Sequence, residues 1–127
     1  LNVVKTLQYK NNEGAIMTTY TINQTNIFSD WLNDLKDPIG KAGIAIRIKR
    51  AESGNFGDCK LLPSTGGIYE MRIFKGNGYR VYYAQQGETI YLLLMGGAKD
   101  SQQTDINKAV KLWQTIQQQD TQDNDSN

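Results

Sequence analysis

Hydrophobic residues recur with a helical period early in the 127-residue chain. Thr25 stands where an N-cap hydroxyl would accept from the first turn of a helix, and Pro38 stands where such a helix must end. The i, i+3, i+4, i+7 spacing that puts side chains on one helix face is followed by Phe28, Trp31, Leu32 and Leu35. We therefore expect a first helix between these two signals.

A second helix is expected to begin at Pro38, with Asp37 as its cap, and to run to about residue 53. Its predicted core face is made of Ile39, Ala42, Ala45, Ile46 and the stem of Lys49. Its predicted outward cations are Lys41, Arg47 and Arg50. Two helices joined this tightly should form an antiparallel hairpin.

Alternation of apolar and polar residues predicts strands in three further segments. Residues 17–22 alternate, and so do residues 68–74 and 79–84, which a short turn joins. The triple-Leu run at residues 92–94 predicts a strand covered on both faces. A third helix, capped by Thr104, is predicted from the apolar face of Ile106, Ala109, Val110, Trp113 and Ile116.

The predicted order is β-α-α-β-β-β-α in one α+β domain at residues 17–116. We expect the helical hairpin to pack on a mostly antiparallel, twisted sheet, followed by a C-terminal helix. Residues 1–16 show no sustained period and precede the first methionine, Met17, which predicts a poorly ordered or non-native extension. Residues 117–127, rich in Gln, Asp and Asn, are expected to form a frayed, acidic tail.

The formal net charge of +1 hides an uneven distribution. Residues 35–111 hold 12 Lys and Arg against 7 Asp and Glu, which gives +5, whereas residues 1–34 carry −1 and residues 112–127 carry −3. The central part of the chain is therefore basic, as in proteins that bind polyanions.

Charged side chains stand on one face of the two predicted strands, where Thr or Ser would suffice. This face is predicted to carry Glu70, Arg72, Arg80 and Tyr82. The two arginines then lie opposite or diagonal to each other, which is unfavourable unless an anion or a carboxylate lies between them. Lys60 and Lys99 can reach the same face. These residues predict a polyanion site with acid–base chemistry.

The arginines of the predicted strands and the cations of the second helix also have a plainer interpretation. Arg72 with Glu70, or Arg80 with Asp58, can form surface ion pairs that contribute about 0–1 kcal/mol. The cations of the second helix can be a solvated helix face. These alternatives stay open from the sequence.

Other chemistries are excluded or not indicated. The chain has no His, which removes every mechanism that uses it as base or ligand, and the single cysteine, Cys59, excludes an internal disulfide. No carboxylate cluster has metal-ligand spacing, so no metal or cofactor is expected. No apolar run approaches the roughly 20 residues of a membrane-spanning helix, so we expect a cytoplasmic protein without a membrane partner.

A series of ordered motifs resembles a known family. The motifs are Phe28-x-x-Trp31-Leu32-x-x-Leu35, Gly54-Asn55-Phe56-Gly57-Asp58-x-Lys60, Tyr69-Glu70-Met71-Arg72, Tyr79-Arg80-Val81-Tyr82 and Leu92-Leu93-Leu94-x-Gly96-Gly97-x-Lys99. Across residues 18–116 the sequence closely resembles the addiction-module killer proteins, a HigB-like branch of the RelE/ParE toxin superfamily.

The resemblance implies a toxin of a type II toxin–antitoxin pair, neutralised by a cognate antitoxin. RelE-like members enter the ribosomal A site and cut mRNA without a metal. A base deprotonates a ribose 2′-OH, which attacks the adjacent phosphate while cations stabilise the developing charge. The implied activity is that of an endoribonuclease (an mRNA interferase) that inhibits translation. The implied partners are antitoxin, ribosome and mRNA, with operator DNA reached only through the antitoxin.

The resemblance also implies residue roles. Arg80 matches the arginine that holds the scissile phosphate, Arg72 matches a second cation, and Glu70, where RelE has a lysine, is the candidate base. Tyr82 completes the candidate catalytic set. The candidate RNA-binding residues are Lys60, Lys99, Arg47, Lys49 and Arg50. The chain departs from RelE at Ile106, which aligns with a tyrosine.

Two other functions stay open at this level. A ParE-like protein would inhibit DNA gyrase without nuclease activity, and an inactive toxin homologue would only bind the antitoxin. Glu70, Arg72 and Arg80 together favour the nuclease, because a gyrase inhibitor needs no base beside paired arginines.

Overall fold

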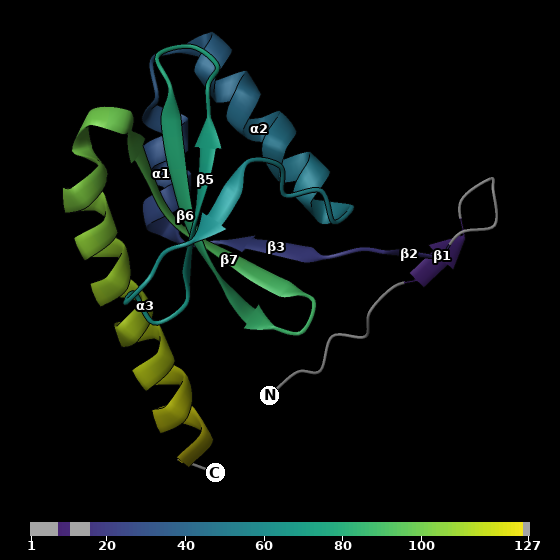
Figure 1. Cartoon of the computed structure of the whole chain (residues 1–127). Helices are drawn as coiled ribbons and strands as arrows, with labels where there is room; N and C mark the ends of the chain where they lie inside the picture. The colour runs from purple at the N-terminus through teal and green to yellow at the C-terminus, as the bar shows by residue number, and fades with distance from the viewer. Residues whose placement is uncertain (1–7, 11–15, 126–127) are drawn as a thin grey trace.

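A five-stranded mixed sheet forms the centre of the computed structural model, which describes residues 8–10 and 16–125 (Figure 1). The sheet order is β3-β7-β6-β5-β4, with β3 parallel to β7 and the other pairs antiparallel. Its strands are β3 (Thr21–Gln24), β4 (Cys59–Leu61), β5 (Ile68–Ile73), β6 (Tyr79–Gly87) and β7 (Ile90–Ala98). A separate hairpin is formed by β1 (Gln8–Lys10) and β2 (Ile16–Thr18).

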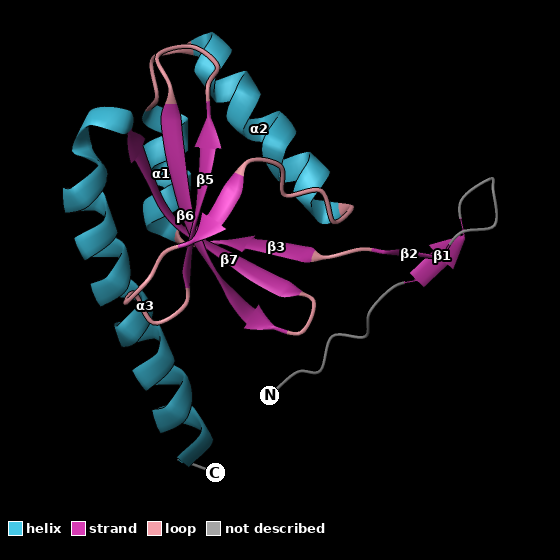
Figure 2. Cartoon of the chain, in the orientation of Figure 1, coloured by secondary structure: helices cyan, strands magenta, loops and turns pink. Residues whose placement is uncertain are grey.

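Helices cover both faces of the sheet (Figure 2). The helices α1 (Asn26–Asp34) and α2 (Pro38–Glu52) pack on one face, where Phe28 and Ile44 share a core with Val81 of β6. A short helical turn, η1 (Lys99–Ser101), leads into α3 (Gln102–Asp125), which buries Trp113 on the other face. The α+β class and the C-terminal helix are therefore confirmed.

Two glycines at the end of β7 let both layers approach the sheet closely. A Cβ at Gly96 would overlap the ring of Trp31 in α1, and a Cβ at Gly97 would overlap the carboxylate of Asp105 in α3. Because Gly97 pairs with Arg80 in the sheet register, the first turns of α3 lie directly beside the predicted site.

The predicted element order differs from the structure in detail. The segment 17–22 holds the end of β2 and the start of β3, and β4 was not predicted because three residues are too short to show an alternation. The predicted tail is helical up to Asp125, since Gln is a good helix former, and α3 begins at Gln102 before the predicted cap Thr104. Within the predicted extension 1–16, residues 8–10 and 16 belong to strands, and the rest lies outside the described residues.

The predicted core face of α2 is wrong. Ile39 and Ile46 are 67% and 51% exposed, and Ala42 and Ala45 are also exposed. The buried residues of α2 are Gly40, Gly43, Ile44 and Ala51. The two glycines explain why α2 presents a different face to the sheet than predicted. They let the β5–β6 hairpin pack closely on the helix through the ring of Tyr79 and the stem of Lys75.

The carboxylate of Asp37 joins α2 to this hairpin. Its Oδ1 accepts from the backbone N–H of Gly40 (3.0 Å), and its Oδ2 accepts from the N–H of Asn77 (2.9 Å) and the hydroxyl of Tyr79 (2.7 Å). These bonds, from Gly40 first and then Tyr79 and Asn77, hold the pKa of Asp37 below its ordinary value of 3.8.

Asp37→Asn is therefore expected to lower the melting temperature at pH 7. A carboxylate whose pKa is depressed in the folded state stabilises the fold above its unfolded pKa, and this stabilisation is lost as the pH falls through the folded pKa. The difference in melting temperature between the wild type and Asp37→Asn should thus narrow below about pH 4. Circular dichroism melts between pH 7 and pH 2.5 measure it, with the exposed Asp34→Asn as control. A gap that stays constant down to pH 2.5 would contradict this role.

Candidate functional site

The register of the sheet brings the two predicted arginines together. Arg72 of β5 pairs directly with Arg80 of β6, and one step along the same face Glu70 pairs with Tyr82. The four predicted catalytic residues therefore lie on one face of the sheet. The two arginines are directly opposite each other, not diagonal.

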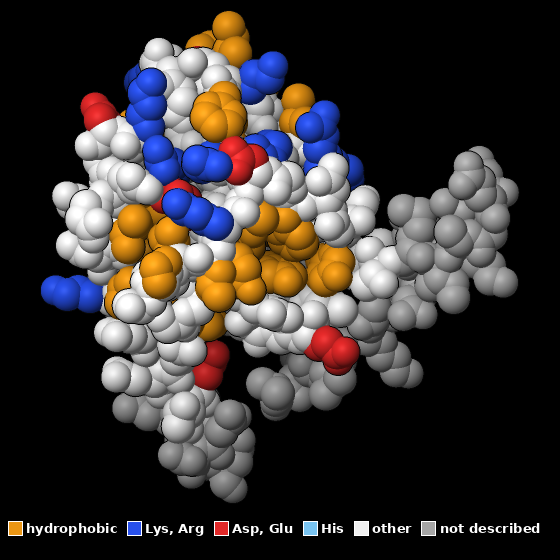
Figure 3. Space-filling model, in the orientation of Figure 1, with side chains coloured by type: hydrophobic (Ala, Val, Ile, Leu, Met, Phe, Trp, Pro, Cys, Tyr) orange, Lys and Arg blue, Asp and Glu red, His pale blue; other side chains and the backbone are white. Residues whose placement is uncertain are grey.

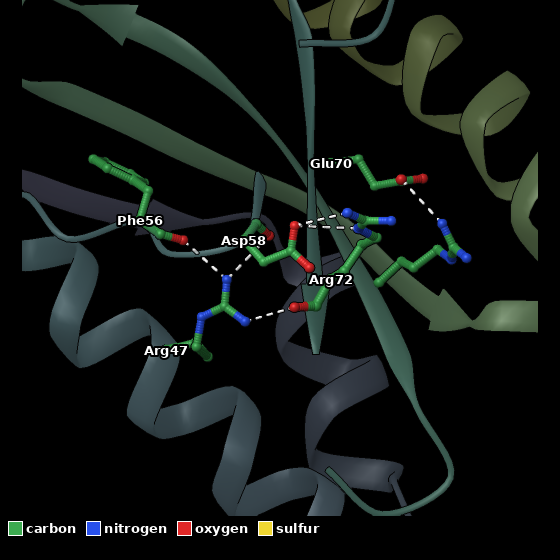
Figure 4. A network of polar contacts seen from close by, with 6 residues as sticks. Arg47, Phe56, Asp58, Glu70 and Arg72 are labelled. Atoms are coloured by element: carbon green, nitrogen blue, oxygen red, sulfur yellow. Dashed lines mark hydrogen bonds and ion pairs between the residues drawn. The ribbon is translucent and has the colours of Figure 1, made fainter. Parts of the chain in front are cut away.

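Each arginine has a carboxylate of its own. Arg80 Nη1 donates to Glu70 Oε1 at 3.0 Å. Arg72 donates to Asp58 Oδ1 from Nη2 (2.9 Å) and Nε (3.3 Å), as Figure 4 shows. The pairs proposed as the plainer interpretation, Arg72 with Glu70 and Arg80 with Asp58, are therefore not the ones formed. The observed pairs offset the repulsion between the two guanidinium groups and fix both side chains.

The expectation that Glu70 stands on a solvent-exposed face of the sheet is wrong. Glu70 is 0% exposed, and its second oxygen, Oε2, accepts from Gln102 Nε2 at 2.8 Å. Tyr82 is also 0% exposed. The reason is the close approach of α3, which places Gln102 and Asp105 over this part of the sheet. In this arrangement Glu70 holds Arg80 and is screened from solvent.

Two polar atoms in this buried cluster have no hydrogen-bond partner among the described residues, namely Tyr82 Oη and Arg80 Nε. Burial raises the pKa of Tyr82 well above its ordinary value of 10.0, and the negative charges of Glu70 and Asp105 raise it further. The phenol is therefore protonated at neutral pH and can act as a hydrogen-bond donor.

The arginine pair is partly open to solvent. The side chains of Arg72 and Arg80 are 42% and 22% exposed. Lys60, opposite Glu70 on the edge strand β4, and Lys99 in η1 are both exposed. Figure 3 shows Lys and Arg side chains gathered on this side of the molecule, directly above an area of hydrophobic side chains. We call Arg72, Arg80, Lys60 and Lys99 the cation row.

The prediction that Arg47 points outward is wrong. Its guanidinium donates to the backbone carbonyls of Arg72 (2.5 Å), Phe56 (2.9 Å) and Asp58 (3.1 Å), as Figure 4 shows. Arg47 therefore joins α2 to β5 and to the segment that carries Asp58, and its charge is not offered to a ligand. Its inward position follows from the same rotation of α2 that exposes Ile39 and Ile46.

The other two cations of α2 stay on the helix surface. The side chain of Lys49 is 83% exposed and forms an ion pair with Glu52 (3.4 Å), and Arg50 is exposed. In the described part of the chain, no hydrogen bond or ion pair joins Lys49 or Arg50 to the cation row.

Sequence reasoning missed the residues that α3 contributes. Gln102 bonds Glu70, and Ser101 Oγ donates to the nearly buried Asp105 at 2.5 Å. It also missed a cluster of aromatic rings on the α2 side of the sheet, with neighbouring ring centroids 4.7–5.9 Å apart. Its members are Tyr20, Phe56, Tyr69, Tyr83 and Tyr91. The available signal was the position of Tyr69 and Tyr83 on the apolar face of the two predicted strands, where they pair with each other.

Within residues 8–10 and 16–125, no group of three or more His, Cys, Asp or Glu side chains could hold a metal ion. None of the helices in these residues is long and apolar enough to cross a membrane.

Comparison with known proteins shows which family the chain belongs to. Residues 30–114 match the family model described as "Phage derived protein Gp49-like (DUF891)". The chain belongs to this Gp49-like family, which is part of the RelE/ParE-like toxin superfamily and whose members are commonly toxins of toxin–antitoxin systems. A Haemophilus influenzae protein, described as "Uncharacterized protein", is 45% identical over 98 residues, which cover 77% of this chain and 97% of that protein.

Proposed function

We propose that this chain is a HigB-like toxin that cuts translated mRNA in the ribosomal A site and is neutralised by a cognate antitoxin. The observation that carries the proposal is the pair of directly opposed arginines, Arg72 and Arg80, each fixed by its own carboxylate and both partly open to solvent. Cations held in place before a substrate arrives stabilise charge that develops on a phosphate without reorganising.

Arg72 and Arg80 are proposed to bind the oxygens of the scissile phosphate. The ribose 2′-OH attacks this phosphate, and the bond to the 5′-oxygen of the next nucleotide breaks. The fragments then end in a 2′,3′-cyclic phosphate and a 5′-hydroxyl. Lys60 and Lys99 are proposed to bind neighbouring phosphates of the RNA, since both are exposed beside the pair.

Glu70 and Tyr82 are buried next to this arginine pair on the same face of the sheet. Glu70 is a positioning residue for Arg80 in the described arrangement, and it can take the 2′-OH proton only after Gln102 has released Oε2. Tyr82 is proposed as a hydrogen-bond donor, because its raised pKa keeps it protonated. The ribosome and the mRNA are proposed to supply the remaining geometry.

The test is induction of the wild-type chain without an antitoxin, followed by primer extension on two reporter transcripts. One transcript is translated, and the other is identical except for a destroyed start codon. We expect growth arrest and new 5′ ends in the translated transcript alone. Intact mRNA with accumulated gyrase–DNA breaks would support the gyrase inhibitor instead, and normal growth would indicate an inactive homologue.

A further inference from the structure

A groove runs between α3 and the chain segment that follows β4. It has a volume of about 770 Å³, which is in the range of small-ligand sites. Leu62, Ile106 and Val110 form its partly buried apolar floor, and Gln103, Asn107 and Lys111 are exposed along its α3 side.

We propose that this groove binds an unpaired base of the mRNA beside the scissile phosphate and thereby sets the sequence preference of cleavage. The inference rests on the proposed function, because it assigns the substrate part that the groove contacts. Sequence-specific RNA recognition combines contact with the face of an unstacked base and hydrogen bonds to its edge. The groove offers both, through its apolar floor and its side-chain amides.

The two amides along the groove bond each other and still have hydrogen-bonding capacity for a ligand. Gln103 Nε2 donates to Asn107 Oδ1 at 3.0 Å, and both side chains are exposed. Each amide keeps further donor and acceptor capacity, and Asn and Gln are the side chains that pair with the edge of adenine.

Two chain segments that line the groove, at Leu62 and Gln103, closely follow residues of the arginine site and the cation row. Gln102, which bonds Glu70, directly precedes Gln103, and Lys60 lies two residues before Leu62. From Gln103 to Gln114, α3 rises by about 16 Å, so the groove leads away from the arginine pair along the helix. Figure 3 shows hydrophobic side chains between α3 and the sheet, immediately below the Lys and Arg side chains.

Charge favours RNA over a protein segment as the occupant. None of the residues lining the groove is acidic, and Lys111 adds a positive charge. A polyanion that enters from the cation row therefore meets no repulsion along this path.

The experiment compares the cleavage sites of Gln103→Ala and Asn107→Ala with those of the wild type. The 5′ ends of fragments from translated transcripts are mapped after induction, and the relative use of each site is measured. We expect the preference between sites to change on the order of tenfold, because a bidentate amide–base contact is worth this much discrimination. Asn33→Ala, an exposed amide on α1, is the matched control and should leave the ranking unchanged.

Whether the wild-type chain cuts mRNA distinguishes a failure of this inference from a failure of the proposed function. A wild type that does not cut overturns both. A wild type that cuts, with the same ranking of sites in Gln103→Ala and Asn107→Ala, overturns the groove alone and assigns it to a different occupant, such as a protein segment. Circular dichroism melts confirm that the exposed substitutions leave the fold intact.

Discussion

Replacing Arg80 by Ala is expected to lower mRNA cleavage by about 10²–10³-fold and to abolish growth arrest, because the scissile phosphate loses a donor fixed in place before binding. Arg80→Lys should recover only part of the activity, since an ammonium group cannot reproduce the planar fork of a guanidinium. Primer extension on a translated reporter measures cleavage, and growth curves measure arrest. The exposed Lys108→Ala on α3 is the control, because it removes a cation outside the site.

A loss of activity in Arg80→Ala needs to be separated from a loss of fold. The substitution leaves the buried carboxylate of Glu70 without its ion-pair partner, which destabilises the protein. The double variant Glu70→Gln/Arg80→Gln replaces the ion pair by neutral amides and should be more stable than Arg80→Ala while remaining inactive. A folded Arg80→Ala or double variant that still arrests growth would remove Arg80 from the site.

Among the proposed single substitutions, Glu70→Ala is expected to lower the free energy of unfolding the most. It leaves the largely buried guanidinium of Arg80 unpaired, removes the acceptor of the Gln102 amide and opens a cavity beneath α3. Because Arg80 keeps some solvent contact, we expect a loss of about 3 kcal/mol in the free energy of unfolding, at the low end for a broken buried pair. Glu70→Gln should lose less, because it still accepts hydrogen bonds.

Urea denaturation followed by circular dichroism measures this loss. The exposed Glu88→Ala, in the turn between β6 and β7, is the matched control and should stay within about 0.5 kcal/mol of the wild type. A free energy of unfolding for Glu70→Ala that is equal to that of Glu88→Ala would contradict the role given to the buried pair.

Local signals were sufficient to predict the helices of the first half. Thr25 accepts from the backbone N–H of Phe28 at 3.1 Å and caps α1, and Asp37 caps α2 before Pro38, as predicted. Helix caps and apolar–polar alternation depend on residues only a few positions apart, so they can be recognised from the sequence alone. For the same reason, the common face of Glu70, Arg72, Arg80 and Tyr82 was predicted correctly.

Contacts between distant segments could not be predicted. The orientation of α2 depends on what Gly40 and Gly43 meet in the hairpin, so the apolar stripe of Ile39 and Ile46 gave the wrong face. The burial of Glu70 likewise depends on α3, which contributes Gln102 from 32 residues away. For the same reason, the sequence could not show which carboxylate pairs with Arg72 and which with Arg80.

The most direct test of the account uses purified wild-type protein, programmed ribosomes and an mRNA with a single 2′-deoxynucleotide at the mapped cleavage site. The cation row is proposed to stabilise a phosphate attacked by the neighbouring 2′-OH, so the all-ribose mRNA should be cut there and the deoxy mRNA should stay intact at that position. Equal cleavage of both mRNAs would contradict the proposed chemistry.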